Sequence, residues 1–282
     1  MSKYYRKIEL VVLSDIHLGT HGCHAKELTK YLSSIKPDIL VLNGDIIDIW
    51  QFKKRYWPKS HMKVVKQILN FAAKGTKVYY ITGNHDETLR RFEGLKMGNL
   101  HILNKLELLL GDQKVVFFHG DVFDIIIQHS KWLAKLGAIS YDALISLNLF
   151  INRVSRFFGK GKVSISKRIK DNVKTAVKYI NKYENTIADY AIQRGFDSVI
   201  CGHIHQPMDK IISDKSGRNI RYLNSGDWIE NLTTLEYHEG KWKLFNYWDD
   251  IVNSIDENGT TDYEFNNKVL FNMMFEEFQN SK

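Results

Sequence analysis

The stretch "IELVVLSDIHLG" (residues 8–19) joins two kinds of sequence, and together they decide the fold. Its first six residues are mostly apolar and include β-branched side chains, which is typical of a strand buried on both faces of a sheet. A carboxylate and an imidazole, Asp15 and His17, follow directly. We therefore predict a first strand that presents chemically active side chains at its carboxyl end.

The same junction between an apolar run and a polar cluster occurs four more times. The apolar runs occupy residues 38–42, 77–81, 114–118 and 198–201. The clusters that follow them are "NGDIID" (43–48), "TGNHD" (82–86), "HGD" (119–121) and "GHIH" (202–205). In open α/β sheets, ligands gather outside the carboxyl ends of the strands, so we expect the five clusters to meet in one place.

The segments between these runs predict an α/β fold. Residues 25–35 and 62–73 have helical spacing and connect neighbouring strands. The strand-like segments 220–224, 233–237 and 241–248 follow one another without helices, which indicates a later antiparallel stretch. The pattern does not distinguish one sheet from two.

Residues 122–197 differ from the rest, because they are helical in pattern and show no obvious strand. We predict a helical cap inserted into a core formed by residues 1–121 and 198–250. The tail 251–282 ends in the helix-like "VLFNMMFEEF" (269–278) and is predicted to be helical.

Composition limits the class of protein. With 44% hydrophobic and 26% charged residues, the chain is globular. No run approaches the roughly 18 apolar residues of a membrane span, and the apolar run after the N-terminal charges is too short for a leader. Two cysteines, Cys23 and Cys201, suggest no disulfide framework and a reducing compartment, so we expect a cytoplasmic protein.

Positive charge is concentrated in one segment. Residues 153–182 contain ten Lys or Arg residues and one acid, Asp171, a balance of +9 against +8 for the whole chain. Such a segment favours a polyanionic partner, either an anionic membrane surface or nucleic acid. A solvated helix face is the alternative.

The strand-end clusters contain seven candidate metal ligands. They are Asp15, His17, Asp45, Asn84, His119, His203 and His205. Carboxylate, imidazole and amide donors without thiolate suit Mn²⁺, which we expect first, or Fe²⁺ or Zn²⁺. Seven ligands exceed what one tetrahedral site needs, so we predict two divalent ions that share a carboxylate and activate water. Asp86 we expect to brace its turn.

The order of motifs D-x-H, G-D-x-x-D, G-N-H-D, H-G and G-H-x-H resembles the calcineurin-like metallophosphoesterases over about residues 8–250. The resemblance implies two mixed sheets packed as a sandwich and flanked by helices. It also implies that Asp45 bridges two ions. One ion would be held by Asp15, His17, Asp45 and His205, and the other by Asp45, Asn84, His119 and His203.

The resemblance implies a catalytic pair as well. His85 corresponds to the family's general acid or electrostatic stabiliser, and Asp48 corresponds to its carboxylate partner. Four further residues lie near the motifs and could contact substrate. Arg90 and Arg91 could clamp phosphate or form a solvated helix face, and His21 and His24 lie close to the first motif.

Beyond these motifs, the chain is similar to the UDP-2,3-diacylglucosamine diphosphatases of lipid A synthesis and their G-N-H-D paralogues. The best-known diphosphatases carry Arg where this chain has His85. The resemblance implies hydrolysis of a lipid-linked pyrophosphate at the inner membrane face, with the apolar insertion covering acyl chains and residues 153–182 meeting lipid heads.

Two other functions remain open. A nuclease or nucleotide phosphodiesterase would use the basic segment on a phosphate backbone, although only Phe157, Phe158 and Tyr179 could stack on bases there. A non-catalytic scaffold would have lost ligands, and none of the seven is missing. The sequence does not indicate an oligomeric state.

Overall fold

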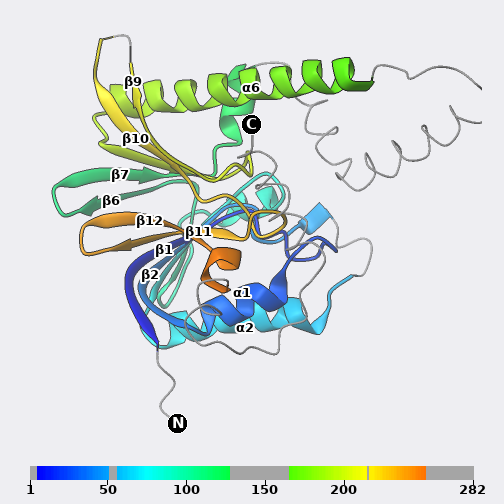
Figure 1. The fold of residues 1–282 in the computed structure, drawn as a ribbon. Helices are drawn as coiled ribbons and strands as arrows, with labels where there is room; N and C mark the ends of the chain where they lie inside the picture. The colour runs from blue at the N-terminus through cyan, green and yellow to red at the C-terminus, as the bar shows by residue number, and fades with distance from the viewer. Residues whose placement is uncertain (1–4, 51–55, 128–164, 215, 252–282) are drawn as a thin grey trace, which may run out of the picture.

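The computed structural model describes residues 5–50, 56–127, 165–214 and 216–251 of the 282-residue chain. In these residues two mixed sheets pack face to face, and helices cover both outer faces (Figure 1). The α/β sandwich that the resemblance implied is therefore confirmed.

The first sheet contains the first three polar junctions. Its strands are β1 (Arg6–Leu13), β2 (Ile35–Asn43), β3 (Lys77–Ile81), β4 (Lys96–Met97), β5 (Leu100–Leu103), β11 (Thr233–His238) and β12 (Lys241–Asn246). They lie in the order β12-β11-β1-β2-β3-β5-β4. The pairs from β1 through β2 and β3 to β5 are parallel, so β1, β2 and β3 end at the same edge of the sheet.

The second sheet contains the other two junctions. Its strands are β6 (Leu106–Leu110), β7 (Gln113–Phe117), β8 (Ser198–Cys201), β9 (Met208–Ser213) and β10 (Asn219–Asn224). They lie in the order β6-β7-β8-β10-β9, with β7, β8 and β10 parallel and both outer strands antiparallel. The fourth and fifth clusters therefore leave neighbouring strands.

The core has three apolar layers, which explains the continuous apolar runs. Leu10 and Val12 of β1 face the second sheet, whereas Val11 and Leu13 face the helices on the other side. Each central strand is thus buried on both faces and has no solvent face to alternate with.

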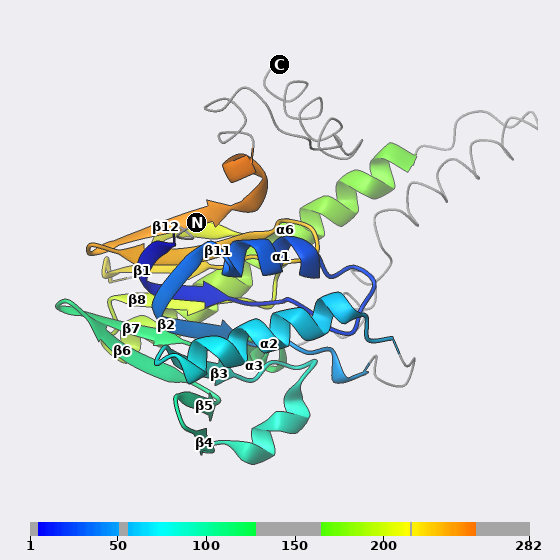
Figure 2. The same ribbon diagram turned by 90° about the horizontal axis from the view of Figure 1, so that it is seen from below.

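Two helices cover the outer face of the first sheet: α1 (Ala25–Leu32) and α2 (Lys59–Ala73) (Figure 2). On α1, Leu28, Tyr31 and Leu32 are buried at the three- and four-residue spacing of one helical face. A short 3-10 helix, η2 (Glu87–Phe92), follows the third cluster.

The second sheet is covered by α3 (Val122–Ile127) and α6 (Ile165–Gln193) (Figure 1). The C-terminal part of α6 packs Tyr183, Ile187 and Ala188 against the sheet, so it forms a layer of the sandwich. None of the described helices combines the length and apolar character that a membrane crossing requires.

Three predictions concern segments that lie partly or wholly outside the described residues. They are the cap at 122–197, whose middle (128–164) is not described, the basic segment at 153–182 and the tail at 251–282. The domain boundaries, including the core at 1–121 and 198–250, stay predictions.

Candidate metal centre

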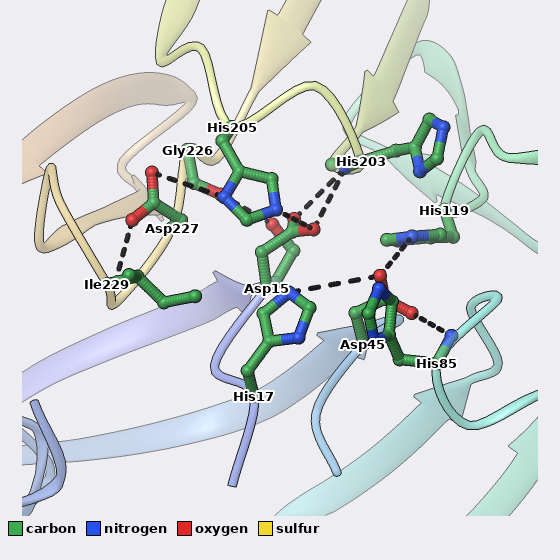
Figure 3. A network of polar contacts seen from close by, with 12 residues as sticks. Asp15, His17, Asp45, His85, His119, His203, His205, Gly226, Asp227 and Ile229 are labelled. Atoms are coloured by element: carbon green, nitrogen blue, oxygen red, sulfur yellow. Dashed lines mark hydrogen bonds and ion pairs between the residues drawn. The ribbon is translucent and has the colours of Figure 1, made fainter. Parts of the chain in front are cut away.

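The structure brings six of the seven predicted ligands into two compact groups. Ligand atoms of Asp15, His17 and His205 all lie within 4.8 Å of one another. Those of Asp45, His119 and His203 form a second such group. Figure 3 shows these side chains converging from loops that follow strands of both sheets.

Asp45 lies beside both groups. Its Oδ2 is 3.2 Å from Nε2 of His119 and 3.9 Å from Nε2 of His17 (Figure 3). In the other group, Oδ1 of Asp15 is 3.3 Å from Nε2 of His205. Asp45 therefore occupies the place that a bridging carboxylate needs, and its assignment as the bridge stays a prediction.

The backbone is strained at most of the predicted ligands. In the described structure, seven non-glycine residues have a positive φ. Five of them are predicted ligands: Asp15 (51°), His17 (51°), Asp45 (53°), His203 (70°) and His205 (53°). Such conformations cost on the order of 1–3 kcal/mol each and persist where the surrounding structure imposes them, typically at functional sites.

Two glycines allow the loops to approach this closely. A Cβ on Gly83 would lie 2.2 Å from Oδ1 of Asp45, and one on Gly202 would lie 2.5 Å from Oδ2 of Asp15. Neither distance is compatible with a side chain, so both positions require glycine for contact with a carboxylate rather than for backbone freedom.

The donor set fits divalent metal ions. Nε2 of His17, Nε2 of His119 and Oδ1 of Asn84 are buried and have no hydrogen-bond partner among the described residues. A buried polar atom left unsatisfied costs on the order of 1–3 kcal/mol. Coordination of a metal would satisfy all three atoms, and it would bring Asn84, the seventh predicted ligand, into the same site.

The charges of these buried side chains also fit a site for divalent cations. Burial by itself raises the pKa of Asp15, but His205 and His119 outweigh burial and lower the pKa to about 2. Burial likewise lowers the pKa of His205, yet Asp15 raises it to about 9. Burial would also raise the pKa of Asp45, and His119 and His17 hold it below its usual range. These buried carboxylates require positive charge, which protonated histidines or divalent cations can provide; a cation would displace the protons.

One histidine is held in a defined tautomer. Nδ1 of His119 lies 2.9 Å from the carbonyl oxygen of Asn43. A carbonyl only accepts, so Nδ1 carries the proton and the neutral ring keeps its lone pair on Nε2, the atom beside Asp45. This is the arrangement expected of a metal-binding histidine.

Asp227, which is not among the residues predicted from sequence, lies beside His205. Its Oδ2 is 3.9 Å from Nδ1 of His205, and its Oδ1 accepts the N–H groups of Ile229 and Glu230 (Figure 3). The sequence carried a signal for it, because "SGD" (225–227) follows the strand-like run 220–224.

The predicted catalytic pair is in contact. Nδ1 of His85 lies 3.1 Å from Oδ2 of Asp48, and that oxygen is 3.6 Å from Nδ1 of His17. Burial lowers the pKa of His85, but the hydrogen bond to Asp48 and the negative charges of Asp45 and Asp48 together outweigh burial and raise it. The His85 side chain is 26% exposed, so its ring is accessible. Its catalytic role stays a prediction.

Asp86 braces the turn, as expected. Its carboxylate accepts the backbone N–H groups of Ile46 (3.0 Å) and Gly83 (2.6 Å) and the hydroxyl of Tyr80 (2.6 Å). It thereby ties the loop after β2 to the loop after β3. This places Asn84 and His85 beside Asp45.

In the described part of the chain, the four residues predicted to contact substrate form no polar or ring contact with the predicted metal ligands. Arg90 donates to Asp121 at 2.5 Å, and Arg91 is exposed. The ring of His21 lies 3.7 Å from that of Tyr56. His24, the residue before α1, pairs with Glu27 of that helix and packs edge-on against Trp248. None of these contacts involves a predicted ligand, and the substrate roles stay predictions.

A two-sheet α/β sandwich with nitrogen and oxygen donors gathered at its strand ends defines a metal-dependent enzyme rather than a binding module of apolar ligands. The chain belongs to the calcineurin-like phosphoesterase family, whose family model matches residues 8–207. The resemblance is thereby confirmed, and the protein is a metal-dependent hydrolase.

Curated relatives cover most of the chain. It is 25% identical to a UDP-2,3-diacylglucosamine hydrolase of Blochmanniella pennsylvanica, over 82% of this chain and 93% of the relative. It is 25% identical to the enzyme of that name from Aliivibrio fischeri, over 83% of this chain and 97% of the relative. Similar solved structures include a dimetal phosphatase from Danio rerio, 12% identical, with a TM-score of 0.40 over 84% of this chain and 95% of that one.

Proposed function

We propose that this protein hydrolyses a P–O bond of UDP-2,3-diacylglucosamine or a related lipid-linked phosphate, using two divalent ions, with Mn²⁺ expected first. The observation that carries the proposal is the convergence of four strand-end clusters into two adjoining donor groups with unsatisfied buried atoms, to which Asn84 of the remaining cluster adds one more such atom. The similarity to UDP-2,3-diacylglucosamine hydrolases over four-fifths of the chain supports the substrate.

The predicted ligands divide into two sets around Asp45. Asp15, His17 and His205 would hold one ion with Asp45, and Asn84, His119 and His203 would hold the other. When bound, a pair of divalent ions polarises phosphoryl oxygens and lowers the pKa of coordinated water, so that hydroxide is available near neutral pH. The chain's own task is to fix these side chains, which the strained loops accomplish.

His85 supplies the proton for the leaving group in this proposal. Its Nδ1–H faces Asp48, which favours the doubly protonated ring. Nε2–H is then free to donate to the leaving oxygen as the P–O bond breaks. Asp48 keeps the ring orientation during the transfer.

The G-N-H-D motif, which contains His85, affects which substrate we propose. Where the best-known diphosphatases carry Arg, His85 presents a cation that can also lose its proton. The same chemistry would serve a different leaving group, so the proposal extends to related lipid-linked phosphates.

The proposed substrate also implies a place in the cell. We propose that the protein works in the cytoplasm at the inner face of the membrane, with residues 153–182 meeting anionic lipid heads. Retention of the full chain by sedimenting anionic vesicles, and not by neutral ones, would support this.

Two substrates distinguish the proposal from its nearest alternative. The purified chain with Mn²⁺ is incubated separately with UDP-2,3-diacylglucosamine and with single-stranded DNA, and an Asp45→Asn variant serves as the inactive control. Release of UMP from the lipid supports the proposal. DNA cleavage without lipid turnover would overturn the substrate and assign the centre to a nuclease.

A further inference from the structure

Asp124 connects the candidate metal centre to the helices over the second sheet. It lies in α3, which starts three residues after His119. Its Oδ2 is 2.7 Å from Nε2 of His203, and its Oδ1 accepts a hydrogen bond from the hydroxyl of Tyr179 in α6. Three segments that are far apart in sequence therefore meet at one carboxylate.

The contact defines which nitrogen of His203 faces the metal centre. An ionised carboxylate only accepts, so the shared proton belongs to Nε2 of His203. The neutral ring then keeps its lone pair on Nδ1. His119, in the same group, is held the opposite way, with its proton on Nδ1 and its lone pair on Nε2.

We infer that Asp124 is a positioning residue that orients His203 and fixes its Nε2–H tautomer, so that Nδ1 is the metal-binding atom. Tyr179 holds Asp124 in place in turn. The inference rests on the two-metal centre of the proposed function. It assigns α3 and α6 a part in the centre that the strand-end clusters alone do not reveal.

The expected effects on stability and on metal affinity distinguish a positioning role of Asp124 from a merely structural one. The side chains of His203 and Asp124 are 15% and 30% exposed, so solvent reaches their hydrogen bond. A partly exposed contact of this kind contributes little to the stability of the fold, so its loss should leave the protein folded. In contrast, loss of an outer partner of a metal-binding histidine typically costs about 10- to 100-fold in metal affinity.

The test measures Mn²⁺ binding to the full-length protein by calorimetric titration, with no substrate present. We expect Asp124→Ala to weaken one of two binding events by about 10- to 100-fold and to leave the other unchanged. Asp124→Asn, which keeps an acceptor, should weaken the same event less. Tyr179→Phe should have a smaller effect of the same kind.

Glu9→Gln is a matched control. It removes one negative charge from another histidine–carboxylate pair, Glu9 with His238 at 3.4 Å, which is exposed and remote from the centre. It should leave both binding events unchanged. Thermal unfolding of the metal-free variants establishes that each is folded.

Nitrogen-15 spectra of the metal-free protein give a second readout, with the His203 signal identified by its absence in His203→Gln. We expect the Nε2–H tautomer in the parent and its loss in Asp124→Ala. Unchanged Mn²⁺ binding in both Asp124 variants, or the Nδ1–H tautomer in the parent, would overturn the inference. A parent that binds no metal would instead overturn the proposed two-metal centre.

Discussion

His85 contacts the metal centre through its backbone and its ring, although it is not one of the seven predicted ligands. Its ring centroid lies 4.5 Å from that of His17, and its ligand atom forms a third compact group with those of His17 and Asp48. Its N–H donates to Oδ1 of Asp45 at 2.8 Å, whereas its imidazole turns to Asp48 and packs against Trp50 at a centroid distance of 4.4 Å. Removal of the side chain leaves the backbone hydrogen bond in place. Metal binding and catalysis can therefore be separated at this residue.

We expect His85→Ala to lower kcat by about 10²- to 10⁴-fold, the usual contribution of a positioned acid. Both metal ions should remain, because the ring is not a predicted ligand. Elemental analysis of the purified variant, alongside kinetics, measures the two effects separately.

His238→Ala is the control for that variant, since this histidine is exposed and lies on β11 away from the centre. It should retain the activity and metal content of the parent. If His85→Ala contained only one ion, His85 would be a ligand and the division of roles between His85 and Asn84 would be wrong.

The seven candidate ligands could be selected from sequence because each one directly follows a buried strand or the turn after it. Asp227 also follows a strand-like run and could have been selected in this way, whereas Asp124 could not. Asp124 lies in the first turn of a helix, where an acid usually faces solvent, and only its neighbours from α6 and the loop after β8 give it a role. Such outer contacts depend on tertiary structure.

At the scale of single elements, the turn between β3 and η2 has no room for a side chain at Gly83. We expect Gly83→Ala to displace Asp45, since the new Cβ would lie 2.2 Å from its Oδ1 and 2.8 Å from the ring of His119. The variant should fold, but it should bind less metal and lose activity.

Gly98→Ala provides the comparison for Gly83→Ala. Gly98 has a φ of 59° and open space around it, so alanine there costs about 1 kcal/mol of stability through the backbone alone. Its metal content should equal that of the parent. Full metal content in Gly83→Ala would show that the loop can relax and that the close approach is not required.

Helix α6 allows a test of its own role as a structural layer. Ile187 is fully buried between α6 and the second sheet, so Ile187→Ala should lower the free energy of unfolding by about 2–5 kcal/mol. Val177→Ala on the same helix is the control, because Val177 is 50% exposed and should change stability by less than about 0.5 kcal/mol. Denaturant titration measures both, and equal effects would contradict the packing of α6 as a core layer.

The longer strands were predictable, and the shorter or less regular ones were not. Strand β2 begins at Ile35 and includes Pro37, ahead of the apolar run at 38–42. Pro37 costs no pairing with β3, since that pairing starts at Ile39. The two-residue β4 and the edge strand β9 carry too little apolar periodicity to be recognised.

At the scale of the whole molecule, the division into two sheets could not be predicted from periodicity. A strand between helices and a strand between a helix and a second sheet are both buried on two faces, so both give the same apolar run. Only the inter-sheet layer distinguishes them, and its residues, such as Val12, Val41, Phe117 and Ile200, come from both halves of the chain.

Four buried tyrosines allow the unfolding of the two sheets to be followed separately. Tyr31 and Tyr80 belong to the outer core of the first sheet, and Tyr183 and Tyr222 to that of the second. Burial raises the pKa of each hydroxyl well above 10. Neighbouring acids, Glu236 beside Tyr31 and Asp86 beside Tyr80, raise it further.

These shifts predict how alkali unfolds the protein. A pKa that is higher in the folded state than its unfolded value of about 10 contributes stability that is fully present below pH 10. That stability is lost as the pH rises towards the folded pKa, so unfolding should occur above pH 10 and should ionise the four tyrosines together. The shared inter-sheet layer joins both halves, so one cooperative step is expected. Tyrosinate absorbance and circular dichroism, recorded together, measure this unfolding transition. Tyr31→Phe and Tyr222→Phe should each remove an equal share of the absorbance change that accompanies it. Two separate transitions would mean that the two sheets unfold independently.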